Sequence, residues 1–93
     1  MDFENIKNIV NHSISNLNSD LPEDDEIKLD DKFRLVGEKS SVDSVIYLNL
    51  MLEIEKNLNL NYSLLEQLSN DLIIDLTLKD LYLKIFKIFN KNA

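Results

Sequence analysis

The stretch DSVIYLNLMLEIEKNL, residues 43–58, begins with a capping acid and continues as an apolar run with helical periodicity. The carboxylate of Asp43 can accept hydrogen bonds from the free amides of a first helical turn, so we predict that a helix begins near this residue. With about 100° of rotation per residue, one arc of this helix carries the side chains that are expected to face a core. These side chains are Tyr47, Leu50, Met51, Ile54 and Leu58.

A second apolar stripe lies on the same predicted helix, outside the arc that faces the core. It consists of Val45, Leu48 and Leu52, on the side that also carries Asn49 and Lys56. If the helix packs by its first arc, these three aliphatic side chains stay at the surface, where such a patch is typical of a docking surface or a ligand groove. The alternative is that the preceding loop or the next helix covers the stripe.

Residues 43–45, Asp-Ser-Val, resemble the attachment site of acyl carrier proteins, in which an Asp-Ser-Leu tripeptide opens the second helix. The family places an apolar residue four positions after the serine, a glutamate eleven after it and a large apolar residue fourteen after it. The chain has Leu48, Glu55 and Leu58 at these positions. The family serine carries 4'-phosphopantetheine, so the resemblance implies that Ser44 is the attachment site of this cofactor.

The resemblance covers residues 35–63 and departs from the family at several positions. Ser63 stands where the family has a proline, and Ile46, Asn49 and Lys56 replace acids that pair with basic partners. Because ion pairs steer association and select partners, the resemblance implies a stand-alone carrier of a specialised pathway, not of general fatty-acid synthesis. It assigns partner contacts to the neighbourhood of the serine, namely to Asp43, Val45, Leu48, Asn49, Leu52, Glu55 and Lys56.

The function that the resemblance implies is that of a carrier and not of an enzyme. The carrier holds an acyl or aminoacyl group as a thioester on the Ser44-linked cofactor and presents it to enzymes in trans. Its implied partners are a phosphopantetheinyl transferase, an acyl-loading synthetase or acyltransferase, and downstream enzymes that use the acyl group. The competing interpretation is an acidic helical adaptor without a prosthetic group, which docks a partner through Val45, Leu48 and Leu52.

A neighbouring serine offers a second register for the same motif. Asp43, which precedes Ser44, lies two residues after Ser41, and Ser41 is closer to Gly37. In that register, however, the glutamate position is taken by Leu52 and the large apolar position by Glu55. We therefore predict that Ser44 and not Ser41 is modified.

The composition limits the function classes further. The 93 residues suffice for a single domain, residues 1–93, with one modest core. A net charge of -7 argues against nucleic-acid binding, which needs clustered Lys and Arg, and indicates basic protein partners. The chain contains no cysteine, so any reactive thiol must be added to it. Without an apolar run of roughly 20 residues or a signal-peptide pattern, we expect a cytoplasmic monomer with no membrane span.

Catalytic and metal-binding patterns are weak in this chain. A catalytic triad needs a nucleophile, a base and an orienting acid, and the sole histidine, His12, is predicted to lie at the surface or boundary of the first helix. Residues 20–31 contain seven acids and one lysine, but no glycine stands at the sixth position of an EF-hand frame. We therefore expect a solvated acidic loop, no metal site and no enzymatic activity.

The fold class predicted for the whole chain is all-α, and the resemblance implies an acyl-carrier-like four-helix bundle with three principal helices and a short third one. Apolar spacing predicts the first helix at residues 2–17. Gly37 is the predicted turn before the second helix, because glycine adopts positive backbone angles without a steric clash.

The last two helices follow from local patterns. Residues 64–72 predict the short third helix, after a loop at residues 59–63. Thr77 and Asp80 are spaced as a capping box at the start of the fourth helix. The inner stripe of this helix is predicted to be Leu78, Leu81, Tyr82, Ile85, Ile88 and Phe89.

Overall fold

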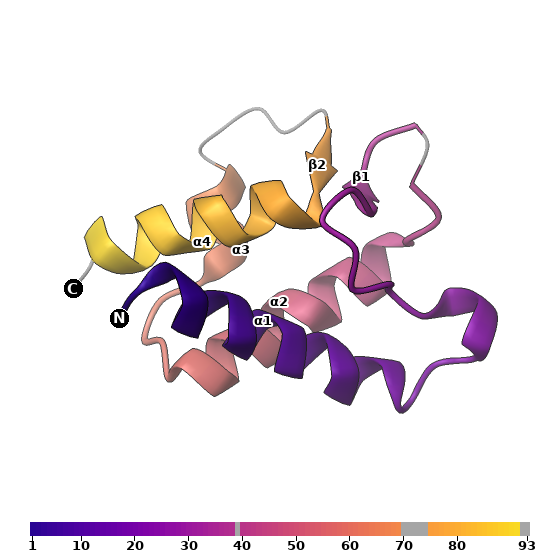
Figure 1. Cartoon of the computed structure of the whole chain (residues 1–93), viewed down its shortest axis with the longest axis horizontal. Helices are drawn as coiled ribbons and strands as arrows, with labels where there is room; N and C mark the ends of the chain where they lie inside the picture. Colours follow the sequence, from indigo (N-terminus) through magenta and orange to yellow (C-terminus); the bar gives the residue numbers. More distant parts are fainter. Residues whose placement is uncertain (39, 70–74, 92–93) are drawn as a thin grey trace.

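The computed structural model describes residues 1–38, 40–69 and 75–91, and helices make up most of it (Figure 1). The α-helices are α1 (Phe3–Asn18), α2 (Ser44–Leu58), α3 (Leu64–Ser69) and α4 (Leu78–Lys91). The connections contain a turn of 3-10 helix, η1 (Glu23–Asp25), and two short strands, β1 (Arg34–Val36) and β2 (Leu76–Thr77). The predicted order of helices is confirmed, and the part of the third helix predicted at residues 70–72 lies outside the described residues.

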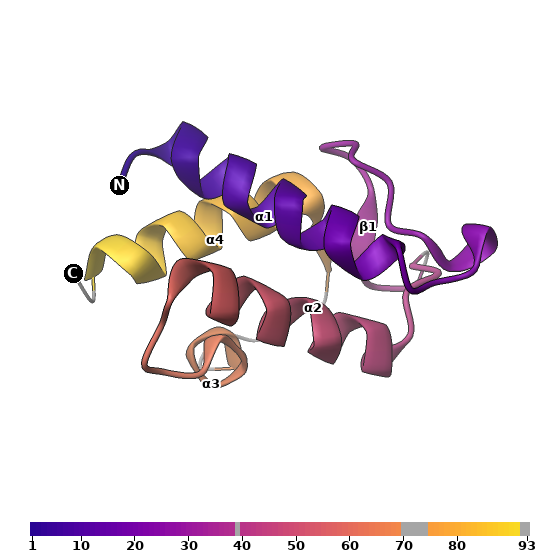
Figure 2. The same ribbon diagram turned by 90° about the horizontal axis from the view of Figure 1, so that it is seen from below.

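The three longer helices enclose the hydrophobic core. Figure 2 shows α1 and α4 on one side of α2 and the short α3 on the other. The apolar periodicity of α1 places Ile6, Val10 and Ile14 in this core, fully buried. From α2 and α4 the core receives Leu50, Met51, Ile54, Leu58, Leu78, Leu81, Tyr82 and Ile85, as predicted, while Tyr47, Ile88 and Phe89 are half-buried at its edge.

Both ends of α2 are fixed by local backbone chemistry. The Asp43 carboxylate accepts a hydrogen bond from the Ile46 amide at 2.9 Å, which confirms the predicted cap. At the other end, Asn59 adopts the left-handed conformation with φ of 55°. The Leu60 amide then donates to the Glu55 carbonyl at 2.9 Å, as in a Schellman motif. The helix therefore begins at Ser44 and ends at Leu58 for identifiable reasons.

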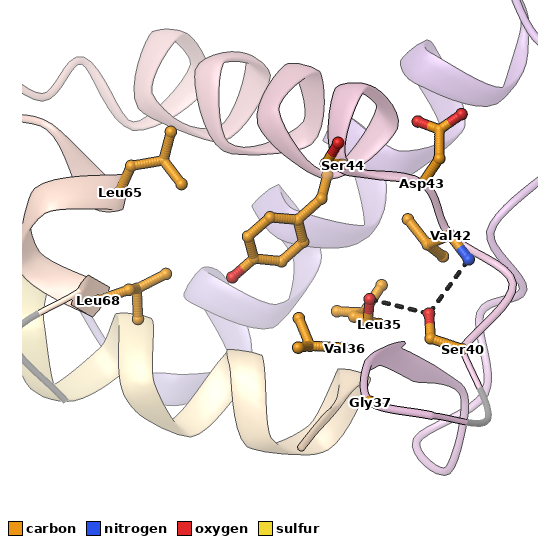
Figure 3. Close-up of a pocket in the computed structure, with 10 residues that line it drawn as sticks. Leu35, Val36, Gly37, Ser40, Val42, Asp43, Ser44, Leu65 and Leu68 are labelled. Carbon is orange, nitrogen blue, oxygen red and sulfur yellow. Dashed lines mark hydrogen bonds between the residues drawn. The ribbon is translucent and has the colours of Figure 1, made fainter. Parts of the chain in front are cut away.

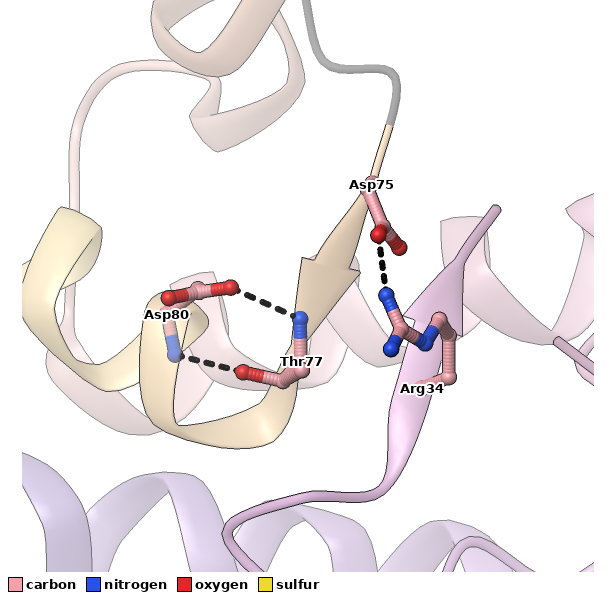
Figure 4. A network of polar contacts seen from close by, with 4 residues as sticks. All are labelled: Arg34, Asp75, Thr77 and Asp80. Atoms are coloured by element: carbon pink, nitrogen blue, oxygen red, sulfur yellow. Dashed lines mark hydrogen bonds and ion pairs between the residues drawn. The ribbon is translucent and has the colours of Figure 1, made fainter. Parts of the chain in front are cut away.

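The capping box of α4 is also present (Figure 4). The Thr77 amide donates to the Asp80 carboxylate at 3.1 Å, and the Asp80 amide donates to the Thr77 hydroxyl at 3.3 Å. A contact that the sequence did not predict completes this turn, because the Leu78 amide donates to the Phe33 carbonyl at 2.8 Å. The chain before β1 is thus tied to the start of α4.

The expectation of an all-α fold is wrong in one respect, because β1 and β2 form a small antiparallel sheet. Arg34 pairs with Thr77 in the register, and the Arg34 guanidinium forms an ion pair with Asp75 (Figure 4). Leu35 and Leu76 are buried, so the sheet closes one end of the core. Strands of three and two residues are too short to show an alternating pattern in the sequence.

The acidic loop before β1 is held in place by one side chain. The Asn18 amide group donates to the Ile27 carbonyl at 2.8 Å, and its oxygen accepts from the Ile27 amide at 2.9 Å. The Ile27 side chain is buried in the core. The segment between Asn18 and Ile27, which includes η1, is therefore anchored at both ends, although its acids are exposed as predicted.

A buried polar contact joins α1 to α2. Ser13 is fully buried, and its hydroxyl donates to the Ile9 carbonyl at 2.8 Å. The Asn57 side chain donates to the same hydroxyl oxygen, also at 2.8 Å. The Ser13 hydroxyl therefore has one partner within α1 and a second on α2, and it links the two helices at a buried position.

None of the helices in residues 1–38, 40–69 and 75–91 has both the length and the apolar character that a membrane span requires.

We predict that Ile54→Ala lowers the free energy of unfolding by about 2–5 kcal/mol, because it empties a fully buried site. Leu48→Ala, on the same helix but with 40% of the side chain exposed, should cost less than about 1 kcal/mol. Urea unfolding of both variants measures the difference. Equal losses in the two variants would contradict the assignment of Leu48 to the surface.

Candidate functional site

Ser44 lies at the amino terminus of α2, as its first helical residue, and is exposed to solvent. Asp43 immediately precedes it and caps the helix through the Ile46 amide. Unpaired amides and the helix dipole make a helix amino terminus favourable for negative charge. The Ser44 hydroxyl is therefore accessible to another enzyme and lies where a phosphate ester would be stabilised.

An open pocket of about 530 Å³ adjoins Ser44 (Figure 3). Its walls come from a continuous stretch, namely β1, the following turn and the start of α2, and from α3 further along the chain. Most of the lining side chains are apolar, and Ser44 and Asp43 stand at the α2 side of the pocket. The lining residues are Leu35, Val36, Gly37, Ser40, Val42, Asp43, Ser44, Tyr47, Leu65 and Leu68.

The turn that forms one wall of the pocket is braced by Ser40. Its hydroxyl donates to the Leu35 carbonyl at 3.0 Å and accepts from the Val42 amide at 3.1 Å, as Figure 3 shows. Gly37 begins this turn with φ of 131°, which confirms the predicted positive backbone angle. Tyr47 also lines the pocket, and burial raises the pKa of its phenol.

The second apolar stripe of α2 is exposed, as predicted. The exposed fractions are 62% for Val45, 40% for Leu48 and 51% for Leu52. Ser44 directly precedes Val45, so an apolar surface adjoins the candidate attachment site. The alternative, in which the loop or another helix buries this stripe, is wrong.

The polar residues that were assigned to partner contacts have different surroundings. Asn49 and Lys56 are exposed, and both line a surface groove beside Leu52. Glu55 is half-buried, and its carboxylate accepts a hydrogen bond from the Leu64 amide at 3.1 Å. Glu55 therefore caps the start of α3.

Ile46 stands where the acyl carrier resemblance places an acid, but it does not lie on the surface. Only 9% of its side chain is exposed, and it belongs to the hydrophobic core. An acid at this position would be buried, at a high cost in free energy. The resemblance places acids at three positions of α2, and only two of these residues, Asn49 and Lys56, face solvent.

The other candidate residues lie apart from this pocket. Ser41 is exposed but lines a different depression, together with Glu23, Asp24 and Glu26. His12 is exposed on α1, as predicted. Among the residues that the structure describes, no group of three or more His, Cys, Asp or Glu side chains is arranged to hold a metal ion.

Comparison of the chain with protein-family models, with curated proteins and with solved structures found no match. The function must therefore be inferred from the residues of this chain and from their geometry.

We predict that Gly37→Ala destabilises the protein and distorts the pocket wall. At this positive φ an added Cβ would lie 2.6 Å from the Asp75 carboxylate, and a strained non-glycine residue costs about 1–3 kcal/mol. Glu38→Ala, one residue later and exposed, is the matched control. Urea unfolding should show a loss for the first variant only, and unchanged stability of Gly37→Ala would contradict the prediction.

Proposed function

We propose that this chain is a carrier protein that holds an acyl or aminoacyl group as a thioester on a 4'-phosphopantetheine linked to Ser44. The observation that carries the proposal is that Ser44 is exposed at the first turn of α2 and also lines an apolar pocket of about 530 Å³. The spacing of Leu48, Glu55 and Leu58 after the serine supports it, because it matches the acyl carrier family. The fold proposed with it is the acyl-carrier type of helical bundle.

The residues around Ser44 fit the proposed cofactor. The hydroxyl is accessible for attachment, and the amino terminus of α2 favours the negative charge of a phosphodiester. The chain has no cysteine, so the thiol of the cofactor would supply the nucleophile that carries the acyl group. Leu35, Val36 and Leu68 offer apolar surface beside the attachment point.

Attachment requires a phosphopantetheinyl transferase as the first partner. The Ser44 oxygen attacks the phosphorus of coenzyme A that bears the pantetheine, and one new P–O bond forms. The pyrophosphate bond breaks, 3',5'-ADP leaves, and the hydroxyl proton passes to a base of the transferase.

The remaining proposed partners act after attachment. An acyl-loading synthetase or acyltransferase forms the thioester, and downstream enzymes consume it. The open pocket between α2, α3 and the turn after β1 offers apolar contact surface to such a group. The chain itself binds and presents the group, and the enzymes supply the chemistry.

The competing function is an adaptor that uses the exposed stripe of Val45, Leu48 and Leu52 without any prosthetic group. The exposure of these side chains favours partner docking in either case. The two proposals differ in whether Ser44 is modified, so the mass of the intact protein separates them.

We predict that the protein gains one phosphopantetheine per chain when it is co-expressed with a broad-specificity phosphopantetheinyl transferase. Ser44→Ala should abolish the gain, because it removes the attacking oxygen. Ser41→Ala is the matched control and should leave the gain intact, since Ser41 is exposed but lies outside the pocket. Intact-mass spectrometry measures all three proteins. Absence of the mass gain in the wild type would favour the adaptor. Loss of the gain only in Ser41→Ala would show that Ser41, and not Ser44, is the attachment site.

We further predict that the modified protein is a poor substrate for enzymes of general fatty-acid elongation. Asn49 and Lys56 supply no negative charge where a basic partner surface expects it, and Lys56 adds repulsion. The double variant Asn49→Glu/Lys56→Glu should therefore be loaded faster by a general malonyl transferase, while the buried Ile46 is left unchanged. Equal and efficient loading of wild type and variant would contradict the prediction.

A further inference from the structure

An acidic segment, residues 20–26, flanks the exposed face of α2. One surface groove is lined by Asp20 together with Leu52 and Lys56. A second depression brings the segment against Ser41, three residues before Ser44. Figure 2 shows η1 projecting beyond the end of α1, at the end of the molecule where α2 begins. The exposed acids of the segment are Asp20, Glu23, Asp24, Asp25 and Glu26.

The position of this segment is fixed by its neighbours. The two hydrogen bonds between Asn18 and the Ile27 backbone hold its ends, at 2.8 and 2.9 Å. Within it, the Asp25 amide donates to the Pro22 carbonyl at 2.9 Å. Because a partner pays less entropy to bind charges that are already ordered, this segment is a suitable electrostatic contact.

The acids of α2 itself are less available to a partner. Glu55 caps α3 through the Leu64 amide, and Glu53 is half-buried and accepts from the Asn16 side chain at 3.4 Å. The exposed polar residues next to the aliphatic stripe are neutral or basic. Apart from Asp43 at the helix cap, the exposed negative charge beside this face therefore comes from segment 20–26 and not from α2.

We propose that partner enzymes dock with an apolar patch on Val45, Leu48 and Leu52 and with Lys or Arg side chains on the acidic segment 20–26. This proposal rests on the proposed carrier function and names the surface by which an enzyme reaches Ser44. Charge complementarity selects the occupant, because five exposed acids attract a basic protein surface. The same charge repels both anionic lipid and a second copy of this chain.

The charged half of the surface is tested by the double variant Glu23→Gln/Glu26→Gln. The control is Glu4→Gln/Glu38→Gln, which removes the same charge from exposed glutamates that line neither groove. The probe is a broad-specificity phosphopantetheinyl transferase with a basic docking surface, and the readout is kcat/KM for modification of Ser44. At low salt we expect the loop variant to be modified about tenfold more slowly, the control to match the wild type, and added salt to remove the difference.

The apolar half is tested by Leu48→Ser against Leu83→Ser. The two leucines have nearly equal exposed fractions, 40% and 41%, but Leu83 lies on α4, outside the proposed surface. Leu48→Ser should raise KM for the same transferase about tenfold at any salt concentration. Leu83→Ser should leave it unchanged. Thermal melts of all variants check that the fold is retained.

The outcomes separate this proposal from the carrier function. A wild-type protein that the transferase does not modify would overturn the carrier function and, with it, the docking surface. Normal modification of the wild type, with equal rates for both charge variants, would overturn the role of the acidic segment alone. A lower kcat/KM of Glu23→Gln/Glu26→Gln that persists at high salt would also contradict the role of the acidic segment, because salt screens an attraction between exposed charges.

Discussion

The hydrogen bond between the Ile46 amide and the Asp43 carboxylate determines where α2 begins, and the arrangement around Ser44 depends on it. A start shifted by one residue would rotate every side chain of α2 by about 100° relative to the cap. Burial of Leu50 and Ile54 would then be incompatible with the capping hydrogen bond. In this sequence the helix start set by the cap is the one that buries both side chains. Ser44 is consequently held at the exposed first turn, with the pocket on one side and the aliphatic stripe next to it.

Features that depend on neighbouring residues were predictable from the sequence. The cap of α2, the capping box of Thr77 and Asp80 and the positive φ of Gly37 all follow from residue types at short spacing. The small sheet was not predictable, because it pairs Arg34 with Thr77 across the chain and each strand is too short for a pattern. The two hydrogen bonds between Asn18 and Ile27 were not predictable either, because nothing in the local sequence distinguishes these two residues from others in a loop.

The candidate site was predictable only in part. The resemblance pointed to Ser44 and the helix wheel pointed to the exposed stripe, whereas the pocket brings Leu35 of β1 together with Leu65 and Leu68 of α3. Glu55 shows how a sequence position can serve another purpose. The family resemblance assigned it to partners, but its carboxylate accepts from the Leu64 amide and so connects α2 to α3. No spacing rule along one helix reveals such a contact, because the amide belongs to the next one.

The pocket beside Ser44 exists only when β1, α2 and α3 are assembled, since each supplies part of its wall. An apolar group that enters it therefore binds the native state and has no equivalent site on the unfolded chain, so its binding adds to the free energy of unfolding. A group tethered to the chain would act at a high effective concentration. Under the proposed carrier function, the folding equilibrium of this chain would be linked to the group on Ser44, and the melting temperature would rise when an apolar group occupies the pocket.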